Sequence, residues 1–197
     1  MPDRIIGLTG QSGSGKSTVS KVFAAHGFDV CDADMVSREV TARGSAALDE
    51  IAAEFGSDML TPDGSLDRRK LGAYVFSDRA ALDRLEGILY PYILRRIGEY
   101  TEAARGSVLL DAPTLFEAGA DRLCDMIISV VADEDIRLRR IMARDGIDET
   151  AARNRFSSQH DEAFFRERSD IVIENNGGED ELISRVTEII ENITGDK

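Results

Sequence analysis

The sequence predicts a three-layer α/β fold in which five parallel strands lie between two layers of helices. Five short, mainly apolar runs are spaced along the 197-residue chain, at residues 5–8, 27–31, 107–111, 125–131 and 170–173. Much of the chain between these runs shows the three- and four-residue apolar spacing of helices. Continuous apolar runs are typical of strands that helices cover on both faces. The strand–helix–strand order at the start of the chain predicts a right-handed βαβ unit.

A glycine-rich segment joins the first predicted strand to the first predicted helix. Residues 10–18 read GQSGSGKST and match the pattern G-x-x-x-x-G-K-[ST] at every fixed position. Such glycines let the backbone turn sharply and aim its N–H groups at phosphate oxygens, and the helix N-terminus adds positive charge. A chance match in a turn is the alternative, and the flanking strand and helix disfavour it. The segment predicts nucleoside triphosphate binding in a P-loop NTPase fold.

Individual residues of this segment have expected roles. The residues expected to bind ATP are Gly13, Ser14, Gly15, Lys16, Ser17 and Thr18. Lys16 would reach the β- and γ-phosphates, and the hydroxyl of Ser17 would ligate Mg²⁺. Asp111 ends the third predicted strand in a Walker-B arrangement and would belong to the same Mg²⁺ site. A loop aspartate without a ligand role is the weaker alternative for Asp111.

Two carboxylates follow the second predicted strand. Asp32 and Asp34 stand where this strand ends, and ligands of parallel α/β sheets bind beyond the carboxyl ends of the strands. Two residues apart on an extended chain, their side chains would point the same way. Either could instead cap the following helix, an alternative that carries about equal weight for Asp32. Asp34 is therefore the better candidate for acid–base chemistry.

Residues 35–106 are expected to be almost wholly helical, which is too much for a simple crossover between two strands. They are interpreted as an inserted lobe that forms the wall of the acceptor site. One helix is expected to open at Leu66 and to end near Phe76, and either Ser77 or Asp78 would cap the next one. Pro91 would kink that next helix or lie in the first turn of its continuation. The chain is thus a single kinase-like domain with a core of about residues 1–34, 107–135 and 169–197, this lobe, and a lid of about residues 136–168.

Arginines are concentrated in the predicted lid. Arg137, Arg140 and Arg144 share one face of a helix that follows the fourth strand, and Arg153 and Arg155 follow on the next helix. Arginines in a phosphotransferase lid stabilise charge on the transferring phosphoryl group. A solvated, mixed-charge surface is the alternative. Outside the lid, Glu117 follows the third strand and is expected to face either Mg²⁺ or an arginine.

Composition limits the possible partners. Lys and Arg number 24 and Asp and Glu 37, which gives a net charge of −13 and disfavours binding to nucleic acid or to an anionic membrane. No apolar run approaches the length of a membrane-spanning helix, and Met1–Arg4 lead straight into the first strand without the pattern of a signal peptide. The two cysteines, Cys31 and Cys124, show no metal-binding or disulfide spacing. A cytoplasmic monomer or weak homo-oligomer that acts on small molecules is expected.

Phosphoryl transfer to a small molecule is the function that these residues favour. A GTPase switch is disfavoured because no Asn-Lys-x-Asp segment follows the fourth predicted strand. Another small-molecule or nucleoside monophosphate kinase on the same scaffold remains a rival. A nucleotide-gated regulator with slow hydrolysis is a rival from a different class. The inserted lobe and the Arg-rich lid favour a kinase.

The residues also carry a specific resemblance, which covers essentially the whole chain. The chain resembles dephospho-CoA kinases through an ordered series of segments: the P-loop, Asp32-Ala33-Asp34, Arg38-Glu39-Val40, Asp63-Gly64-x-Leu66-Asp67-Arg68, Val75-Phe76, Leu85-Glu86 with Pro91, Phe116-Glu117-x-Gly119, Arg144-Asp145, Arg155 with Gln159, and Asp170 with Ile173-x-Asn175-x-Gly177. The P-loop is common to many families. The Asp-Ala-Asp and Asp-Gly-x-Leu-Asp-Arg segments are far more specific.

The resemblance implies transfer of the ATP γ-phosphate to the ribose 3′-hydroxyl of dephospho-CoA, the last step of coenzyme A biosynthesis. It implies that Asp34 is the base or orienter of that hydroxyl, and that Lys16 with the loop amides holds ATP. Arg140 and Arg144 would close on the phosphates, and Asn175 and Gly177 would lie along the adenine. The substrate-binding residues implied in this way are Asp32, Asp34, Leu66, Asp67, Arg68 and Glu117.

Two positions depart from the family pattern. Tyr90 stands where the family usually has a histidine before Pro91, so a hydroxyl or a different packing must replace the imidazole. Gln11 and Ser12 replace the more usual Gly-Ile inside the P-loop. These are variable positions of the motif, and little effect is expected from them.

Overall fold

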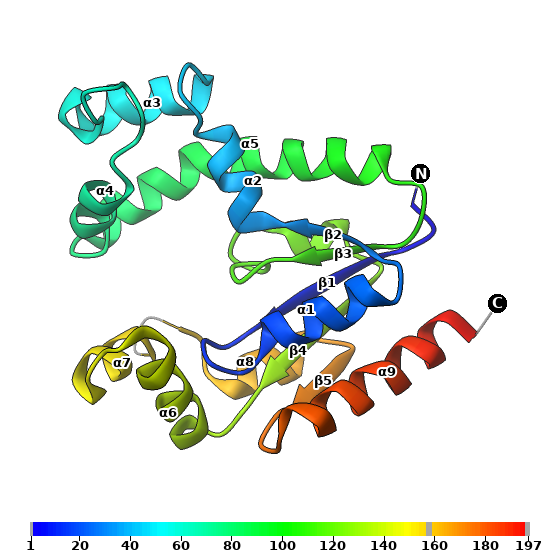
Figure 1. The fold of residues 1–197 in the computed structure, drawn as a ribbon. Coiled ribbons are helices and arrows are strands. Elements are labelled where there is room, and N and C mark those ends of the chain that lie inside the picture. Colours follow the sequence, from blue (N-terminus) through cyan, green and yellow to red (C-terminus); the bar gives the residue numbers. More distant parts are fainter. Residues whose placement is uncertain (1, 157–158, 196–197) are drawn as a thin grey trace. The chain divides into compact units, whose positions relative to one another are not determined.

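The computed structural model describes residues 2–156 and 159–195 (Figure 1). Its elements, in chain order, are β1 (Ile5–Gly10), α1 (Lys16–Ala25), β2 (Asp29–Asp32), α2 (Ala33–Val40), α3 (Ala46–Phe55), α4 (Arg68–Val75), α5 (Arg79–Ala103), β3 (Val108–Asp111), β4 (Met126–Val131), α6 (Glu134–Asp145), α7 (Glu149–Phe156), α8 (Glu162–Arg168), β5 (Ile171–Glu174) and α9 (Glu179–Gly195). Short 3-10 turns occur at Ser57–Met59 and Ala120–Leu123. The chain divides into two compact units, Met1–Cys31 with Ala104–Lys197, and Asp32–Ala103.

The strands form a single five-stranded sheet in the order β2-β3-β1-β4-β5. The pairings of β1 with β3, β1 with β4 and β4 with β5 are parallel, and Leu8 lies opposite both Asp111 and Ile128. The central strand is therefore β1, the strand that leads into the P-loop. The predicted α/β fold with a five-stranded parallel sheet is confirmed.

Helices of the first unit cover both faces of this sheet. On one face α1 and α9 lie side by side, and Val19, Phe23 and Val186 pack with the strand residues Leu8 and Val130 in one core (Figure 1). On the other face α8 packs on β4 and β5. Because both faces are covered, the strands can be apolar throughout, which is why their continuous apolar runs were readable.

Both cysteines lie at this sheet, Cys31 within β2 and Cys124 beside β1. Cys31 in β2 is buried, and a side chain at Gly7 in β1 would place its Cβ 2.8 Å from Sγ of Cys124. Burial raises the pKa of the Cys124 thiol to about 12, and the carboxylates of Asp121 and Asp125 add to the effect. The absence of a side chain at Gly7 thus makes room for a thiol that stays protonated at neutral pH.

The second unit is helical, as predicted for the inserted segment. Its apolar core joins Ile51 of α3, Leu71 and Val75 of α4, and Ala81 and Leu85 of α5. Pro91 lies within a single continuous α5, so this helix is neither ended nor restarted there. Within the described residues 2–156 and 159–195, no helix combines the length and apolar character needed to span a membrane.

Helix starts in this unit correct one prediction and settle an open alternative. The prediction that a helix opens at Leu66 is wrong: α4 begins at Arg68, because the side chain of Asp67 accepts a 2.9 Å hydrogen bond from the amide of Lys70 and acts as the N-cap. Leu66 instead pairs with Leu60 in an antiparallel bridge. Asp78 rather than Ser77 caps α5, since its Oδ1 accepts from the amides of Ala80 and Ala81.

Candidate active site

The P-loop needs glycine for close packing as well as for its sharp turn, as Gly13 and Gly15 illustrate. Gly13 and Gly15 have φ angles of +80° and +100°, a region that side chains disfavour. A Cβ at Gly13 would lie 2.8 Å from the carbonyl oxygen of Arg137, and one at Gly15 would lie 2.3 Å from Nδ2 of Asn175. The loop is thus packed directly against the residues that follow β4 and β5, and a larger residue at either position would displace them.

Two side chains hold carbonyl groups of this loop. Nδ2 of Asn175 donates a 2.7 Å hydrogen bond to the carbonyl oxygen of Ser14, and Nη1 of Arg140 lies 3.4 Å from that of Gly13. In a trans peptide the C=O and N–H groups point in opposite directions. Holding the carbonyl of Ser14 therefore fixes the direction of the Gly15 amide, one of the groups expected to bind phosphate.

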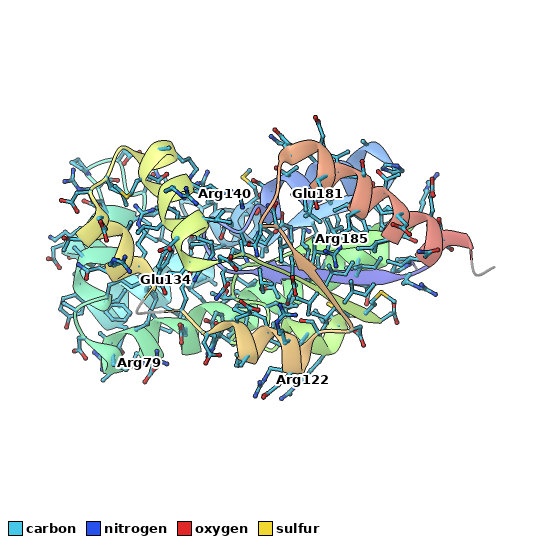
Figure 2. All side chains as sticks on the ribbon, turned by 90° about the horizontal axis from the view of Figure 1, so that it is seen from below. Arg79, Arg122, Glu134, Arg140, Glu181 and Arg185 are labelled. Atoms are coloured by element: carbon cyan, nitrogen blue, oxygen red, sulfur yellow. The ribbon has the colours of Figure 1, made fainter. Side chains whose placement is uncertain are left out.

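Arg140 links the loop to the segment between β5 and α9. Its guanidinium also donates to the carbonyl oxygens of Asn175 at 3.0 Å and Gly177 at 3.2 Å. Figure 2 shows Arg140 on the side of α6 that faces this segment. The structure therefore brings together Arg140, Asn175 and Gly177 with the P-loop, although they lie more than a hundred residues away in the chain. Their expected contacts with ATP remain predictions.

Lys16 and Asp111 meet at the end of β3. Nζ of Lys16, the first residue of α1, forms an ion pair with Oδ1 of Asp111, and their side chains are only 20% and 13% exposed. This pair follows from the register of the sheet, in which β1 and β3 are neighbours. A partly buried ammonium–carboxylate pair beside a glycine-rich loop concentrates both signs of charge where a metal–phosphate complex would need them.

Residues suited to Mg²⁺ are present at this place. Ser17 is exposed in the first turn of α1, next to Lys16, and Asp111 supplies a carboxylate. Among residues 2–156 and 159–195, no group of three or more His, Cys, Asp or Glu side chains is gathered as a metal cage. Mg²⁺ in phosphoryl-transfer sites is usually held by one or two protein oxygens together with substrate phosphates. One carboxylate and one hydroxyl therefore fit this metal.

A cavity of about 270 Å³ lies beside the loop. It is lined by Gly15, Thr18, Arg140, Asn175, Glu179 and Leu182. Four of these residues were predicted for the nucleotide or the phosphates. Glu179 and Leu182 of α9 were missed, because nothing in the sequence indicates that the first turns of the last helix face the P-loop. A cavity of this kind, bordered by a phosphate loop, is a candidate place for the base of a nucleotide.

The other arginines after β4 are held in different ways. Arg137 is 6% exposed, its Nε donates to the carbonyl oxygen of Ala132, and its guanidinium lies 4.3 Å from the centre of the Phe156 ring. Arg144 donates two hydrogen bonds to Asp145, at 2.7 and 3.0 Å, and Arg155 pairs with the same carboxylate. The hydrogen bond from Arg144 and that from Arg155 lower the pKa of Asp145 to about 2. Asp145 thus fixes two of the predicted lid arginines.

Asp32 and Asp34 lie in the second unit and differ from the geometry expected for them. The prediction of two carboxylates on an extended chain is wrong, because α2 begins at Ala33 and Asp34 lies in its first turn. Oδ1 of Asp32 accepts hydrogen bonds from the amides of Asp34, at 2.8 Å, and Met35, at 3.1 Å. Asp32 is the N-cap of α2, which is the alternative that the sequence had left open. Asp34 is exposed at the start of this helix.

Arg68 has a cationic neighbour in the same unit. Nη2 of Arg68 donates to the hydroxyl of Thr41. Burial lowers the pKa of Arg68, and the charge of Arg38 lowers it further. Sequence reasoning gave no role to Arg38 beyond the family pattern, because α2 and α4 are separated in the chain by α3. Two arginines that repel each other within one helical unit form a place where an anion would be stabilised.

Glu117 does not contact an arginine in the described part of the chain. Its Oε1 lies 3.4 Å from Nε2 of His160, whose ring stacks on Phe164 at a centroid distance of 3.6 Å. The neighbouring Phe116 meets Phe164 edge-on. Glu117 was expected to face either Mg²⁺ or an arginine; its described neighbour is a histidine on the segment before α8, and the Mg²⁺ alternative stays a prediction.

Comparisons with known proteins agree on one family. The model of the dephospho-CoA kinase family matches residues 4–181. A dephospho-CoA kinase from Fusobacterium nucleatum is 38% identical over 190 residues, which is 96% of this chain and 98% of that protein. One from Thermobifida fusca is 41% identical over 194 residues, covering 95% of each chain.

Solved structures give the same result. A protein from Thermus thermophilus is 32% identical, with a TM-score of 0.81 over 98% of both chains. The dephospho-CoA kinase from Campylobacter jejuni is 25% identical, with a TM-score of 0.73 over 98% of both chains. A shikimate kinase from Acinetobacter baumannii, at 16% identity and a TM-score of 0.57, shares the P-loop kinase fold. With its P-loop and its Lys16–Asp111 pair, the chain belongs to the dephospho-CoA kinase family of ATP-dependent kinases, whose reaction is the last step of coenzyme A biosynthesis.

Proposed function

We propose that this chain transfers the γ-phosphoryl group of ATP to the ribose 3′-hydroxyl of dephospho-CoA. The observation that carries the proposal is the P-loop of a dephospho-CoA kinase family member, with Lys16 beside Asp111 and its carbonyls held by Asn175 and Arg140. Phosphoryl transfer depends on positioning and charge neutralisation more than on covalent chemistry. A loop clamped in this way supplies the positioning.

ATP would be bound through residues of the first unit. The amides of Gly13, Gly15 and Lys16 would donate to its phosphates, with help from Ser14, Ser17 and Thr18. Ser17 and Asp111 would hold Mg²⁺, which neutralises charge on the phosphates when it is bound. Lys16 would then exchange part of its contact with Asp111 for the phosphates. The base would lie in the cavity that Asn175 lines, and Gly177 is assigned to the adenine by family position.

The acceptor would be bound through residues of the second unit. Asp34, exposed at the first turn of α2, would orient the 3′-hydroxyl and accept its proton. Arg68, with Arg38 near it, would attract the diphosphate of dephospho-CoA. Leu66 and Asp67 precede α4 and would line the same pocket, while Asp32 would contribute by setting the start of α2. Glu117 of the first unit is assigned to the acceptor by family position.

Arginines would stabilise the transferring group. Arg140 and Arg144, both on α6, carry guanidinium groups that suit phosphate oxygens. Charge of this kind acts most strongly where water is excluded. The lid role of residues 136–168, a cytoplasmic location and a monomeric or weakly oligomeric state are parts of the same proposal, supported by the family and by the net charge of −13.

The test is a reaction of the purified protein with ATP, Mg²⁺ and dephospho-CoA, read by mass spectrometry. The expected product is heavier than the acceptor by one phosphoryl group, forms only with Mg²⁺, and serves a CoA-specific enzyme. Lys16→Ala is the matched control, and its turnover should fall about a hundredfold or more, the scale of removing a transition-state donor. Product from a different alcohol but not from dephospho-CoA would overturn the acceptor assignment. ATP binding without any product would favour a nucleotide-gated regulator.

A further inference from the structure

The side chain of Gln159 contacts the P-loop at a residue that the motif leaves free to vary. Oε1 of Gln159 accepts a hydrogen bond of 3.2 Å from the amide of Ser12, and Nε2 donates one of 2.7 Å to Oγ of the same serine. These two bonds join residues 147 positions apart. Both the oxygen and the nitrogen of the Gln159 side-chain amide therefore form hydrogen bonds with Ser12.

The backbone of Gln159 is itself fixed. Its amide donates a 2.9 Å hydrogen bond to the carbonyl oxygen of Phe156, the last residue of α7. Phe156 in turn stacks under the guanidinium of the buried Arg137 on α6. The side chain of Gln159 thus reaches the loop from a backbone position anchored to α7, which is what a positioning residue needs.

Ser12 is one of three loop amides that the protein occupies itself. The amide of Gln11 donates to Val130 in β4, that of Ser14 donates to the carbonyl oxygen of Gln11, and that of Ser12 donates to Gln159. The capacity to bind phosphate is left to the remaining amides, those of Gly13 and Gly15 among them. Gln159 therefore helps to decide which N–H groups of the loop face a ligand.

The neighbouring Gln11 gives the same region a second polar feature. Gln11 is 5% exposed, and among residues 2–156 and 159–195 its Oε1 has no hydrogen-bond partner. Gln11 lines a cavity of about 310 Å³ together with Arg137, Phe156 and Gln159. The loop therefore borders a cavity on this side. Its conformation at Ser12 depends on hydrogen bonds, of which Gln159 supplies two.

We infer that Gln159 is a positioning residue for ATP, which acts through Ser12 to hold the P-loop in its phosphate-binding conformation. This inference rests on the proposed function and goes further by giving a role to a residue that the family resemblance names only by its position. It also gives a purpose to the Ser12 departure from the family pattern, since a serine hydroxyl offers Nε2 of Gln159 an acceptor that an apolar side chain would not.

The test is a double-mutant cycle on ATP affinity, measured by calorimetry with the full chain and without acceptor. Gln159→Leu removes both hydrogen bonds and should weaken ATP binding about tenfold, and Ser12→Ala removes one and should weaken it about threefold, if each bond is worth the usual net amount. The double variant should be no weaker than Gln159→Leu, because the bond to Oγ is already lost. Ser184→Ala, which removes a hydroxyl on α9 that donates to Asp180, is the matched control and should bind ATP like the parent.

A local measurement separates positioning from general stability. Hydrogen exchange of the peptide containing Ser12 should become faster in Gln159→Leu, while exchange in α9 and the melting temperature change little. Equal ATP affinity in Gln159→Leu and the parent would overturn the inference, and so would losses that multiply to about thirtyfold in the double variant. If Gln159→Leu folds poorly, the Ser12→Ala variant alone tests the inference. Hydrogen exchange and ATP affinity equal to those of the parent in Ser12→Ala would exclude an action of Gln159 through Oγ of Ser12. ATP binding by the parent without phosphorylation of dephospho-CoA would instead overturn only the proposed acceptor.

Discussion

The side-chain amide of Asn175 donates a 2.7 Å hydrogen bond to the carbonyl oxygen of Ser14, 161 residues earlier in the chain. Asn175 is 6% exposed, and its own carbonyl oxygen accepts from Arg140 at 3.0 Å. The residue that follows β5 thus fixes a peptide unit of the loop that follows β1. The sheet order makes this possible, since only β4 separates these two strands.

Asn175→Leu should weaken ATP binding about tenfold, because a buried carbonyl left without its donor costs about 1–3 kcal/mol. Isothermal calorimetry with ATP measures the change. Asn176→Leu is the matched control: Asn176 is exposed and exchanges hydrogen bonds of 2.8 and 2.9 Å with Asp133 rather than with the loop. Equal ATP affinities of the two variants would contradict the clamp.

Arg140→Ala should lower turnover at least about tenfold, since it removes donors to Gly13, Asn175 and Gly177 and a cation expected near the phosphates. Arg140→Lys should restore only part of the rate, because an ammonium cannot reproduce the planar guanidinium fork. Steady-state kinetics provide the measurement. Arg139→Ala, an exposed neighbour whose Nε donates to Asp135, should keep the parent rate. A parent-like rate in Arg140→Ala would make this arginine part of the solvated surface.

Asp32→Ala should destabilise the protein by about 0.5–2 kcal/mol, the usual cost of losing an N-cap. Asp32→Ser keeps an oxygen for the amides of Asp34 and Met35 and should recover most of that loss. Urea unfolding measures stability, and turnover is followed in the same samples. Parent-like turnover in Asp32→Ser would limit Asp32 to capping α2. Lost turnover in a stable Asp32→Ser protein would show that its carboxylate binds substrate.

Asp34→Asn should lower kcat about a hundredfold to ten-thousandfold, the range for removing a general base, with ATP affinity largely retained. The measurement combines kcat with the Kd for ATP. Loss of ATP binding at a normal kcat would instead assign Asp34 to the metal or to the fold.

Acid should remove a contribution of Asp145 to stability. The pKa of this carboxyl is about 2 in the folded chain against its ordinary value of 3.8, so only the unfolded chain takes up its proton between about pH 4 and pH 2. The contribution is therefore complete above about pH 4 and is lost as the pH falls toward 2. Asp145→Asn should be less stable than the parent at pH 7, and the gap in urea midpoint should narrow below pH 4. A gap that stays constant with pH would contradict this.

The strands could be predicted closely from the sequence, because a strand covered on both faces is encoded by a continuous apolar run. The run expected at residues 125–131 is β4 at Met126–Val131, and the run expected at 170–173 is β5 at Ile171–Glu174. Helix starts were harder to predict, because they depend on which polar side chain accepts hydrogen bonds from the first amides of the helix. Asp32 and Asp67 both cap helices in this way. Asp34 therefore lies within a helix and Leu66 lies outside one, the reverse of what was predicted.

The candidate site likewise has a part that could be predicted from the sequence and a part that could not. The P-loop is contiguous, so its residues could be recognised without a structure. Its clamps are not contiguous: Arg140, Gln159 and Asn175 reach it because α6, the segment before α8 and the end of β5 meet at the carboxyl edge of the sheet. Predicting those contacts would have required the strand order and the register, which no single segment encodes. Arg38 was named only as part of the family pattern for a similar reason, since its relation to Arg68 depends on how α2 and α4 pack.

The space left by Gly7 has a further chemical effect. The proposed acceptor ends in a free thiol, and its oxidised forms are disulfides that a protein thiolate could attack. Cys31 is 1% exposed, and the pKa of Cys124 is about 12, so neither cysteine offers an accessible thiolate at neutral pH. A protonated thiol attacks disulfides poorly. Cys124, whose thiol occupies the space that a side chain at Gly7 would fill, is therefore expected to be a poor nucleophile toward disulfides of the acceptor at neutral pH.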